Sequence, residues 1–312
     1  MSDHAGDDAA NLHPASARRR RKGGHRMSDP QGPTVRRRRL GSELRRLRDH
    51  AGLRLEDVAK VLECSTSKVS RIETGQVLAK ALELRAMLDL YGVTDDEARR
   101  VIIDIHRRAS ESGWWEQDEY ESVLPSGLGV YVGLEYDARL VQTWELSWVT
   151  GLLQTADYAR AVLGSSRIGQ SEEADRLVNV RMERQKRLTA SSEPLELWAV
   201  MDESVFRRPI GGPDTVRDQI GHILDLGKLP NVNIQVCPLS KGMHPGLRGS
   251  FAILEFGPAD PRVVYVEAPS GNLFVERDSQ VRSFASSYSA LQATALDPTD
   301  SAALLQRVAK EK

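Results

Sequence analysis

Cysteine is scarce in this chain. Only two of its 312 residues are cysteines, Cys64 and Cys237, and they lie in regions of different character. Two distant cysteines do not make the disulfide framework of a small secreted domain, so we expect two free thiols in a reducing compartment. The length of the chain leaves room for about two domains.

Long apolar runs are also absent. No segment approaches the roughly 20 apolar residues that a membrane-spanning helix needs. The first residues lack the hydrophobic segment of a secretory signal. We therefore expect a cytoplasmic protein.

The motifs of common enzyme classes are missing as well, including H-E-x-x-H, the P-loop and G-x-S-x-G. The residues that come closest to a nucleophile, a base and an orienting acid are Cys237, His244 and Glu267. Cys237 precedes a proline inside an apolar run, where a buried structural thiol is the usual outcome. We predict that the protein is not an enzyme and has no catalytic residues, metal ligands or cofactor.

Negative charge is scarce at one end of the chain. The net charge is −1, yet residues 1–39 hold ten Lys and Arg against four Asp and Glu. Residues 1–35 have little to bury and are predicted to form a disordered basic arm, which either follows a polyanion or stays a solvated tail. Met-Ser-Asp occurs at residues 1–3 and again at 27–29, so translation from Met1 or from Met27 stays open.

Apolar spacing in residues 54–75 predicts two short helices that meet at a sharp angle, a helix-turn-helix. Leu55, Val58 and Leu62 mark the buried stripe of the first helix, and Val69 and Ile72 mark that of the second. Almost no linker separates them. The stripe of a preceding helix is formed by Leu40, Leu44, Leu47 and Ala51, and two further helices follow before residue 110.

The second helix of the pair is predicted to begin at a serine cap. The hydroxyl of Ser65 can accept a hydrogen bond from a free backbone N–H of this helix. The residues then left exposed are small or form hydrogen bonds, namely Thr66, Ser67, Lys68, Ser70 and Arg71. A helix that enters the major groove of DNA needs such a surface. Thr94 and Glu97 form a predicted capping box before the fifth helix.

The pattern L-x-x-V-A-x-x-L-x-x-S-x-x-x-V-S-R-I-E-x-G, from Leu55 to Gly75, resembles the phage-repressor (XRE, Cro/C1-type) helix-turn-helix family. One departure is Glu63, which stands where the family usually has glycine. A non-glycine residue in a left-handed turn costs roughly 1 kcal/mol. The resemblance implies a DNA-binding protein associated with the nucleoid.

The resemblance also implies roles for individual residues. Thr66, Ser67, Ser70 and Arg71 are the candidate readers of bases, and Arg54, Ser65 and Lys68 the candidate phosphate contacts. Arg71 is the strongest reader, because arginine binds guanine with two hydrogen bonds; an ion pair with Glu73 or Glu63 is the alternative. Further phosphate contacts are predicted for the block of arginines before the first helix, Arg36, Arg37, Arg38 and Arg39. A near-palindromic site and a homodimer are expected.

Residues 111–312 are predicted to form an α+β domain with a mostly antiparallel sheet and helices on one face. Tryptophans cluster at its start, which marks a junction. The apolar patterns predict strands at 140–144, 195–201, 232–237, 250–256, 262–267 and 272–277, and helices at 135–139, 155–163, 174–188, 213–226, 279–293 and 301–310.

Five phrases of this region are similar to a family of unknown function that follows a helix-turn-helix in many actinomycete regulators. They are GLLQTADYARAVL, RMERQKRL, DESVFRRPIGG, VNIQVCPLSKGMHPGLRGSF and VVYVE. Thr150 stands where the family typically has proline. The resemblance implies a regulatory domain that often works with a small partner protein encoded nearby.

Two functions are therefore expected from the sequence. The first is a transcriptional regulator whose C-terminal domain binds an effector or a small partner protein. The second is an antitoxin-like member of a two-gene pair, in which DNA binding serves autoregulation. The glycine-rich loop 241–249 is either a recognition element, with His244 and Arg248 as its candidate ligand-binding residues, or a flexible hairpin loop with solvated ends.

Overall fold

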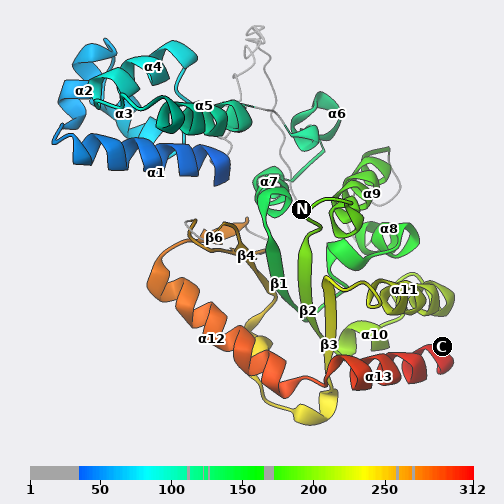
Figure 1. Cartoon of the computed structure of the whole chain (residues 1–312). Coiled ribbons are helices and arrows are strands. Elements are labelled where there is room, and N and C mark those ends of the chain that lie inside the picture. Colours follow the sequence, from blue (N-terminus) through cyan, green and yellow to red (C-terminus); the bar gives the residue numbers. More distant parts are fainter. Residues whose placement is uncertain are drawn as a thin grey trace, which may run out of the picture.

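The computed structural model describes residues 35–110, 113–121, 123–125, 127–164, 172–257, 260–268 and 271–312. A helical N-terminal region is followed by an α+β domain (Figure 1). The predicted basic arm lies outside the described residues, apart from Val35. The helices of the N-terminal region are α1 (Val35–His50), α2 (Leu55–Val61), α3 (Thr66–Glu73), α4 (Ala81–Leu90) and α5 (Asp96–Ser110).

The five N-terminal helices pack around one apolar core, as their stripes predict. Leu44, Val58, Val69 and Leu88 are fully buried in it. The turn between α2 and α3 holds Glu63 in the left-handed region, with φ +48°. The helix-turn-helix geometry is thus kept without a glycine.

A close approach and a buried ion pair join α1 to α3. A Cβ on Gly41 would lie 2.5 Å from the carbonyl oxygen of Glu73, so only glycine lets the two backbones come this near. Arg48 of α1 donates from Nε and Nη2 to the Glu73 carboxylate, at 2.6 and 3.0 Å. Both side chains are buried. The orientation of α3 is therefore fixed by α1.

The C-terminal domain alternates helices with strands and then ends in a meander and two helices. Its elements are α6 (Asp118–Glu121), α7 (Leu128–Asp137), β1 (Leu140–Glu145), α8 (Ala156–Gly164), α9 (Glu172–Gln185), β2 (Glu196–Asp202), α10 (Ser204–Arg207), α11 (Pro213–Leu226), β3 (Val232–Cys237), β4 (Phe251–Glu255), β5 (Val263–Val266), β6 (Leu273–Val275), α12 (Asp278–Thr294) and α13 (Pro298–Lys310). All six predicted strands are present.

The sheet is mixed, so the prediction of a mostly antiparallel sheet is wrong. Its strand order is β3-β2-β1-β4-β5-β6. β1, β2 and β3 are parallel, whereas β4, β5 and β6 each run antiparallel to their neighbour. The reason lies in the connections. Helices α8 and α9 link β1 to β2, and α10 and α11 link β2 to β3, so these strands return in the same direction.

Helices cover both faces of the sheet, which corrects the prediction of helices on one face (Figure 1). On one face Val141, Leu197 and Leu254 belong to a core that includes buried residues of α8, α11 and α13. On the other face Trp144 and Ile253 pack with residues of α12. Alternate side chains of each strand therefore enter different cores.

The predicted tryptophan junction is only partly one structure. Trp114 and Trp115 contact each other edge to face, with ring centroids 5.7 Å apart, and Trp115 packs with Val132 of α7 and Val180 of α9. Trp144 lies instead inside the sheet core. The aromatic cluster at the start of the domain thus anchors α7 on α9.

Candidate functional site

The exposed surface of α3 carries the residues expected to read DNA. The hydroxyl of Ser65 accepts from the backbone N–H of Lys68 at 3.2 Å, which confirms the predicted cap. Val69 and Ile72 point into the core. Thr66, Ser67 and Arg71 are exposed, and Lys68 and Ser70 are half-buried.

Arg71 makes no ion pair with any residue that the structure describes. Glu73, one of its two expected alternatives, is buried and bound by Arg48. The side chain of Arg71 is therefore available to a ligand in front of α3.

The candidate phosphate contacts differ in their surroundings. Arg54 is exposed at the first turn of α2, where its backbone N–H donates to Oδ2 of Asp57 at 2.8 Å. Lys68 donates from Nζ to Oε1 of Glu83 on α4 at 2.5 Å, and this hydrogen bond raises the pKa of Lys68. Arg54 is thus the cation that needs no rearrangement to meet a phosphate.

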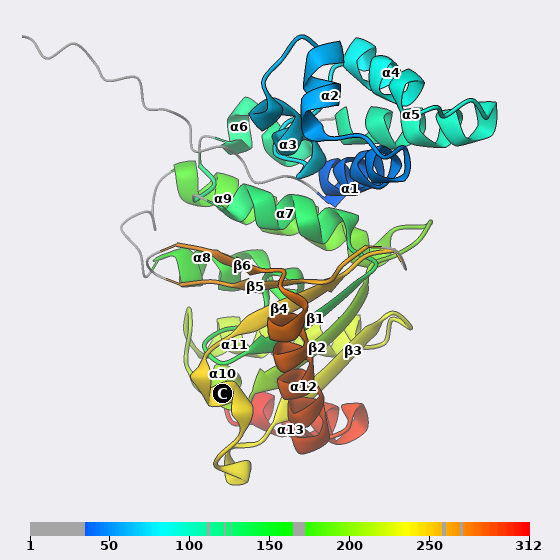
Figure 2. The same ribbon diagram turned by 90° about the vertical axis from the view of Figure 1, so that its left-hand side faces the viewer.

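The arginine block before the first predicted helix lies inside α1 and faces the C-terminal domain (Figure 2). Arg36 pairs with Asp137 of α7 at 2.8 Å. Arg38 pairs with Glu276 at 2.6 Å, and Arg39 lies 3.9 Å from Asp260. Nε of Arg37 donates to the carbonyl of Ala109 at 3.5 Å. Arg36, Arg38 and Arg39 thus contact carboxylates of the same chain, and Arg37 a backbone carbonyl, so a role at phosphates requires that they exchange partners.

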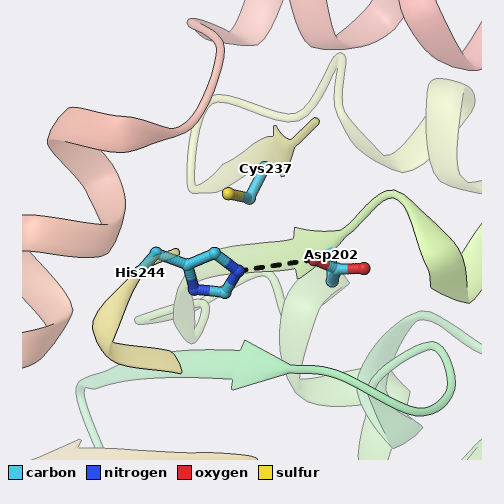
Figure 3. Close-up of side chains that lie close together, drawn as sticks. All are labelled: Asp202, Cys237 and His244. Carbon is cyan, nitrogen blue, oxygen red and sulfur yellow. Dashed lines mark ion pairs between the residues drawn. The ribbon is translucent and has the colours of Figure 1, made fainter. Parts of the chain in front are cut away.

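His244 and Arg248, the two candidate ligand residues of the loop, are not brought together. Arg248 is exposed, whereas His244 is buried beneath the loop. The imidazole lies edge to face against Trp144, at 5.1 Å between centroids. His244 instead meets Asp202 and Cys237, which come from the ends of β2 and β3 (Figure 3).

Asp202, Cys237 and His244 are a compact buried group whose ligand atoms lie within 4.8 Å of one another. Nε2 of His244 is 3.7 Å from Oδ2 of Asp202. The acid beside the cysteine and histidine is therefore Asp202, and Glu267 lies elsewhere. Such sulfur, nitrogen and oxygen donors suit Zn²⁺. Burial, with the nearby charge of Asp202, raises the pKa of the Cys237 thiol to about 11, which opposes both metal binding and nucleophilic attack.

A second feature of the domain is a cavity of about 470 Å³ beyond the carboxyl end of β1. Residues from several distant segments line it, among them Tyr131, Glu145, Trp148, Arg181, Tyr265 and Glu267. Three of these are ionisable side chains without an ion-pair partner in the described part of the chain, namely Glu145, Arg181 and Glu267. A concave site with a few converging polar groups is the usual form of a small-molecule pocket.

Neighbouring charges in the cavity wall are fully paired. Arg184 donates from Nε and Nη2 to Oε1 and Oε2 of Glu135, at 2.6 and 2.7 Å. Tyr131 donates to the same carboxylate at 2.9 Å. The pair of Arg184 with Glu135 holds α9 against α7 at the wall of the cavity. Arg181 lies one helical turn before Arg184 and lines the cavity itself.

Two family models match the chain. The model described as "Domain of unknown function (DUF5753)" matches residues 128–307, which is more than half of the chain. The chain belongs to the DUF5753 family. A model described as "Helix-turn-helix domain" matches residues 39–101. The protein is thus a helix-turn-helix regulator with a C-terminal domain of unknown function. No curated protein and no solved structure matches it.

The cavity belongs to the DUF5753 domain, and the sequence did not predict it. Four of the five phrases that carry the family resemblance contribute to its wall, for example through Gln154, Arg181, Ser250 and Glu267. The available signal was the set of ionisable residues within these phrases.

None of the helices described is long and apolar enough to cross a membrane.

Proposed function

We propose that the protein is a sequence-specific transcriptional regulator that inserts α3 into the major groove of DNA. The observation that carries the proposal is the exposed, hydrogen-bonding surface of a firmly held α3, with Arg71 unpaired among the described residues. A recognition helix reads bases with its outward side chains while its inward face stays in the domain core.

Thr66, Ser67, Ser70 and Arg71 are the proposed readers of base edges. Arg54, Ser65 and Lys68, at the first turns of α2 and α3, are the proposed phosphate contacts, where free backbone N–H groups add to the attraction for anions. A single α3 covers few base pairs. We therefore propose that two copies bind half-sites about 10 base pairs apart as a homodimer.

The C-terminal domain is proposed to control this binding through an effector. The open cavity with three ionisable residues supports a small-molecule signal. A two-gene pair with a small partner protein would instead bind one site at its own promoter. Genome-wide mapping of bound DNA distinguishes them, since a regulator occupies many dispersed sites.

The DNA-binding proposal is tested by selecting binding sites from random DNA with the full-length protein. Fluorescence anisotropy then compares Arg71→Ala and Arg54→Ala on the selected site and on random DNA. Arg71→Ala is expected to cost about 1–3 kcal/mol on the selected site only, and Arg54→Ala to weaken both DNAs alike with a salt slope lower by about 1.

The matched control is Arg100→Ala, which removes an exposed arginine of α5. It should leave specificity unchanged. Equal losses for Arg71→Ala on both DNAs would remove Arg71 from the readers, and failure to select any sequence would overturn the proposal.

A further inference from the structure

The cavity of the DUF5753 domain lies where the sheet changes its connectivity. From β1 the chain crosses to β2 on one side, while β4 lies antiparallel to β1 on the other. The wall includes Glu145 at the end of β1 and Phe251 at the start of β4. In open α/β sheets such a switch point, beyond the carboxyl ends of strands, is the common place for a ligand.

Arg181 is held in this cavity without a carboxylate partner. Its Nη1 donates to the carbonyl of Leu177 at 3.3 Å, a contact within α9, and no acid of the described residues lies within ion-pair distance. Burial and the positive charge of Arg184 together lower the pKa of Arg181 to about 10, against the charge of Glu267, which lies beyond ion-pair distance and raises it. A half-buried arginine that has no acid within ion-pair distance does not stabilise the fold. Its guanidinium group is suited to bind an anionic group of a ligand.

The acidic side chains of the cavity are Glu267 and Glu145, and Glu145 can ionise when a cation lies beside it. Glu145 accepts from the hydroxyl of Thr143 at 3.0 Å, and neither carboxyl pairs with a described lysine or arginine. Burial, together with the charge of Glu267, raises the pKa of Glu145 to about 8. Hydrogen bonds with Thr143 and Ser250 and the charge of Arg184 act in the opposite direction and lower this pKa. Tyr158 and Tyr265 also interact electrostatically with Glu145.

We propose that this cavity binds a small zwitterion of the amino-acid or dipeptide class, with its carboxylate on Arg181 and its ammonium group between Glu145 and Glu267. Tyr131 and Tyr265, whose rings stack at 4.1 Å, offer an apolar wall to the rest of the molecule. A volume of about 470 Å³ is of the size that small-molecule sites have. This site does not depend on the proposed reading of DNA.

The charge pattern selects a zwitterion over simpler ligands. A plain anion would meet Arg181 but also the charge of Glu267. A plain cation would meet the two glutamates but also Arg181. Only a molecule with both charges gives each of the three side chains a partner of opposite charge, which matters most for Arg181 and Glu145, the two that are half-buried.

Binding should also release a proton. Below a pH of about 8 the carboxyl of Glu145 is mostly protonated, and an ammonium group beside it favours the charged form. At pH 7 the complex is therefore expected to release close to one proton, which a neutral site would not do.

The test is isothermal titration calorimetry of the full-length protein, without DNA, against the free amino acids and a set of glycyl dipeptides. Titrations at pH 7 in two buffers of different ionisation enthalpy count the protons released. We expect saturable binding of at least one compound, with about one proton released. Blocking either the carboxylate or the amine of that compound should weaken binding by about 10- to 100-fold.

Three variants assign the binding to this cavity. Arg181→Met is expected to weaken binding by about 10- to 100-fold, and Glu145→Gln to remove the proton release. Arg176→Met is the matched control, because Arg176 lies on the same helix and pairs with Glu172 on the surface. The proposal is overturned if no compound binds, if compounds that lack one charge bind equally well, or if Arg181→Met binds like the unaltered protein. Loss of DNA binding alone would affect only the proposed regulator function.

Discussion

Buried and half-buried charges in this protein fall into two kinds. Arg48 with Glu73, and Arg184 with Glu135, form bidentate pairs in which both partners are buried. Arg181 and Glu145 have no such partner among the described residues, although burial shifts the pKa of each. Paired charges specify how elements pack, whereas unpaired charges cost stability and are usually kept for function.

The raised pKa of Glu145 predicts a pH-dependent stability. Its folded pKa of about 8 exceeds the ordinary 4.5, so between these values the folded protein holds a proton that the unfolded chain has lost. Stability should therefore fall as the pH rises from 5 to 8. Glu145→Gln removes this dependence, and relative to the unaltered protein it should gain roughly 1–3 kcal/mol over that range.

Thermal unfolding at pH 5, 6, 7 and 8 measures this difference. Glu183→Gln, an exposed change on α9, is the control and should show no trend. A constant difference between Glu145→Gln and the unaltered protein at every pH would show that Glu145 ionises normally.

The pair between α1 and α3 predicts a second residue-level effect. Arg48→Met leaves the Glu73 carboxylate buried without its partner and should cost about 3–5 kcal/mol. Replacing both, as Arg48→Met with Glu73→Leu, removes the unpaired charge and should recover most of the loss. Urea unfolding of the two variants decides the point. A double variant no more stable than Arg48→Met would mean that shape, rather than charge, holds the helices.

Single-residue predictions succeeded where the partner lies nearby in the sequence. The Ser65 cap is such a case, because its donor is three residues away. The cap of α5 was displaced by one residue, since Asp95 rather than Thr94 accepts from Ala98. The prediction that Glu267 is the acid beside Cys237 and His244 was wrong. That acid is Asp202, which reaches them only through the pairing of β2 with β3.

At the scale of elements, periodic helices and apolar strands were predictable from the sequence, and their mutual directions were not. The predicted helix at 135–139 covers only the end of α7. Nearly all sides of α7 are apolar, with Tyr131, Val132, Leu134 and Glu135 buried, so no stripe reveals its start. Strand direction follows from crossover helices, which were recognised as helices but not as connections between parallel neighbours.

The space around two helical glycines predicts opposite effects of replacing them with alanine. Gly41 lies where α1 approaches α3, and Gly221 lies on α11. Gly41→Ala places a Cβ 2.5 Å from the Glu73 carbonyl oxygen, so the helices must separate at a cost of roughly 1–3 kcal/mol. Gly221→Ala, on an open part of α11, meets nothing within 4 Å and should stabilise by about 0.5–1 kcal/mol. Melting temperatures test both. An unchanged melting temperature for Gly41→Ala would mean that α1 and α3 can separate slightly without loss of stability.

For the whole molecule, the two regions are joined through the basic end of α1. Arg38 and Arg39 meet Glu276 and Asp260 of the C-terminal domain, beside a large groove of about 1110 Å³ between the regions. The sequence predicted these arginines as phosphate contacts. It could not show that acidic residues more than 200 positions away compete for them.

This competition predicts that the C-terminal domain weakens DNA binding through Asp260 and Glu276. Changing them together to Asn and Gln releases Arg38 and Arg39, which can then neutralise phosphates. Affinity for random and selected DNA should rise together, and the salt slope should steepen by up to about 2, because each phosphate contact contributes about 0.9. The control, Glu183→Gln with Asp225→Asn, makes the same change in net charge at exposed sites of the C-terminal domain. Anisotropy titrations at salt concentrations from about 50 to about 200 mM compare the salt slopes of the double variant and its control. An identical slope for both variants would show that the ion pairs hold the domains together without competing with DNA.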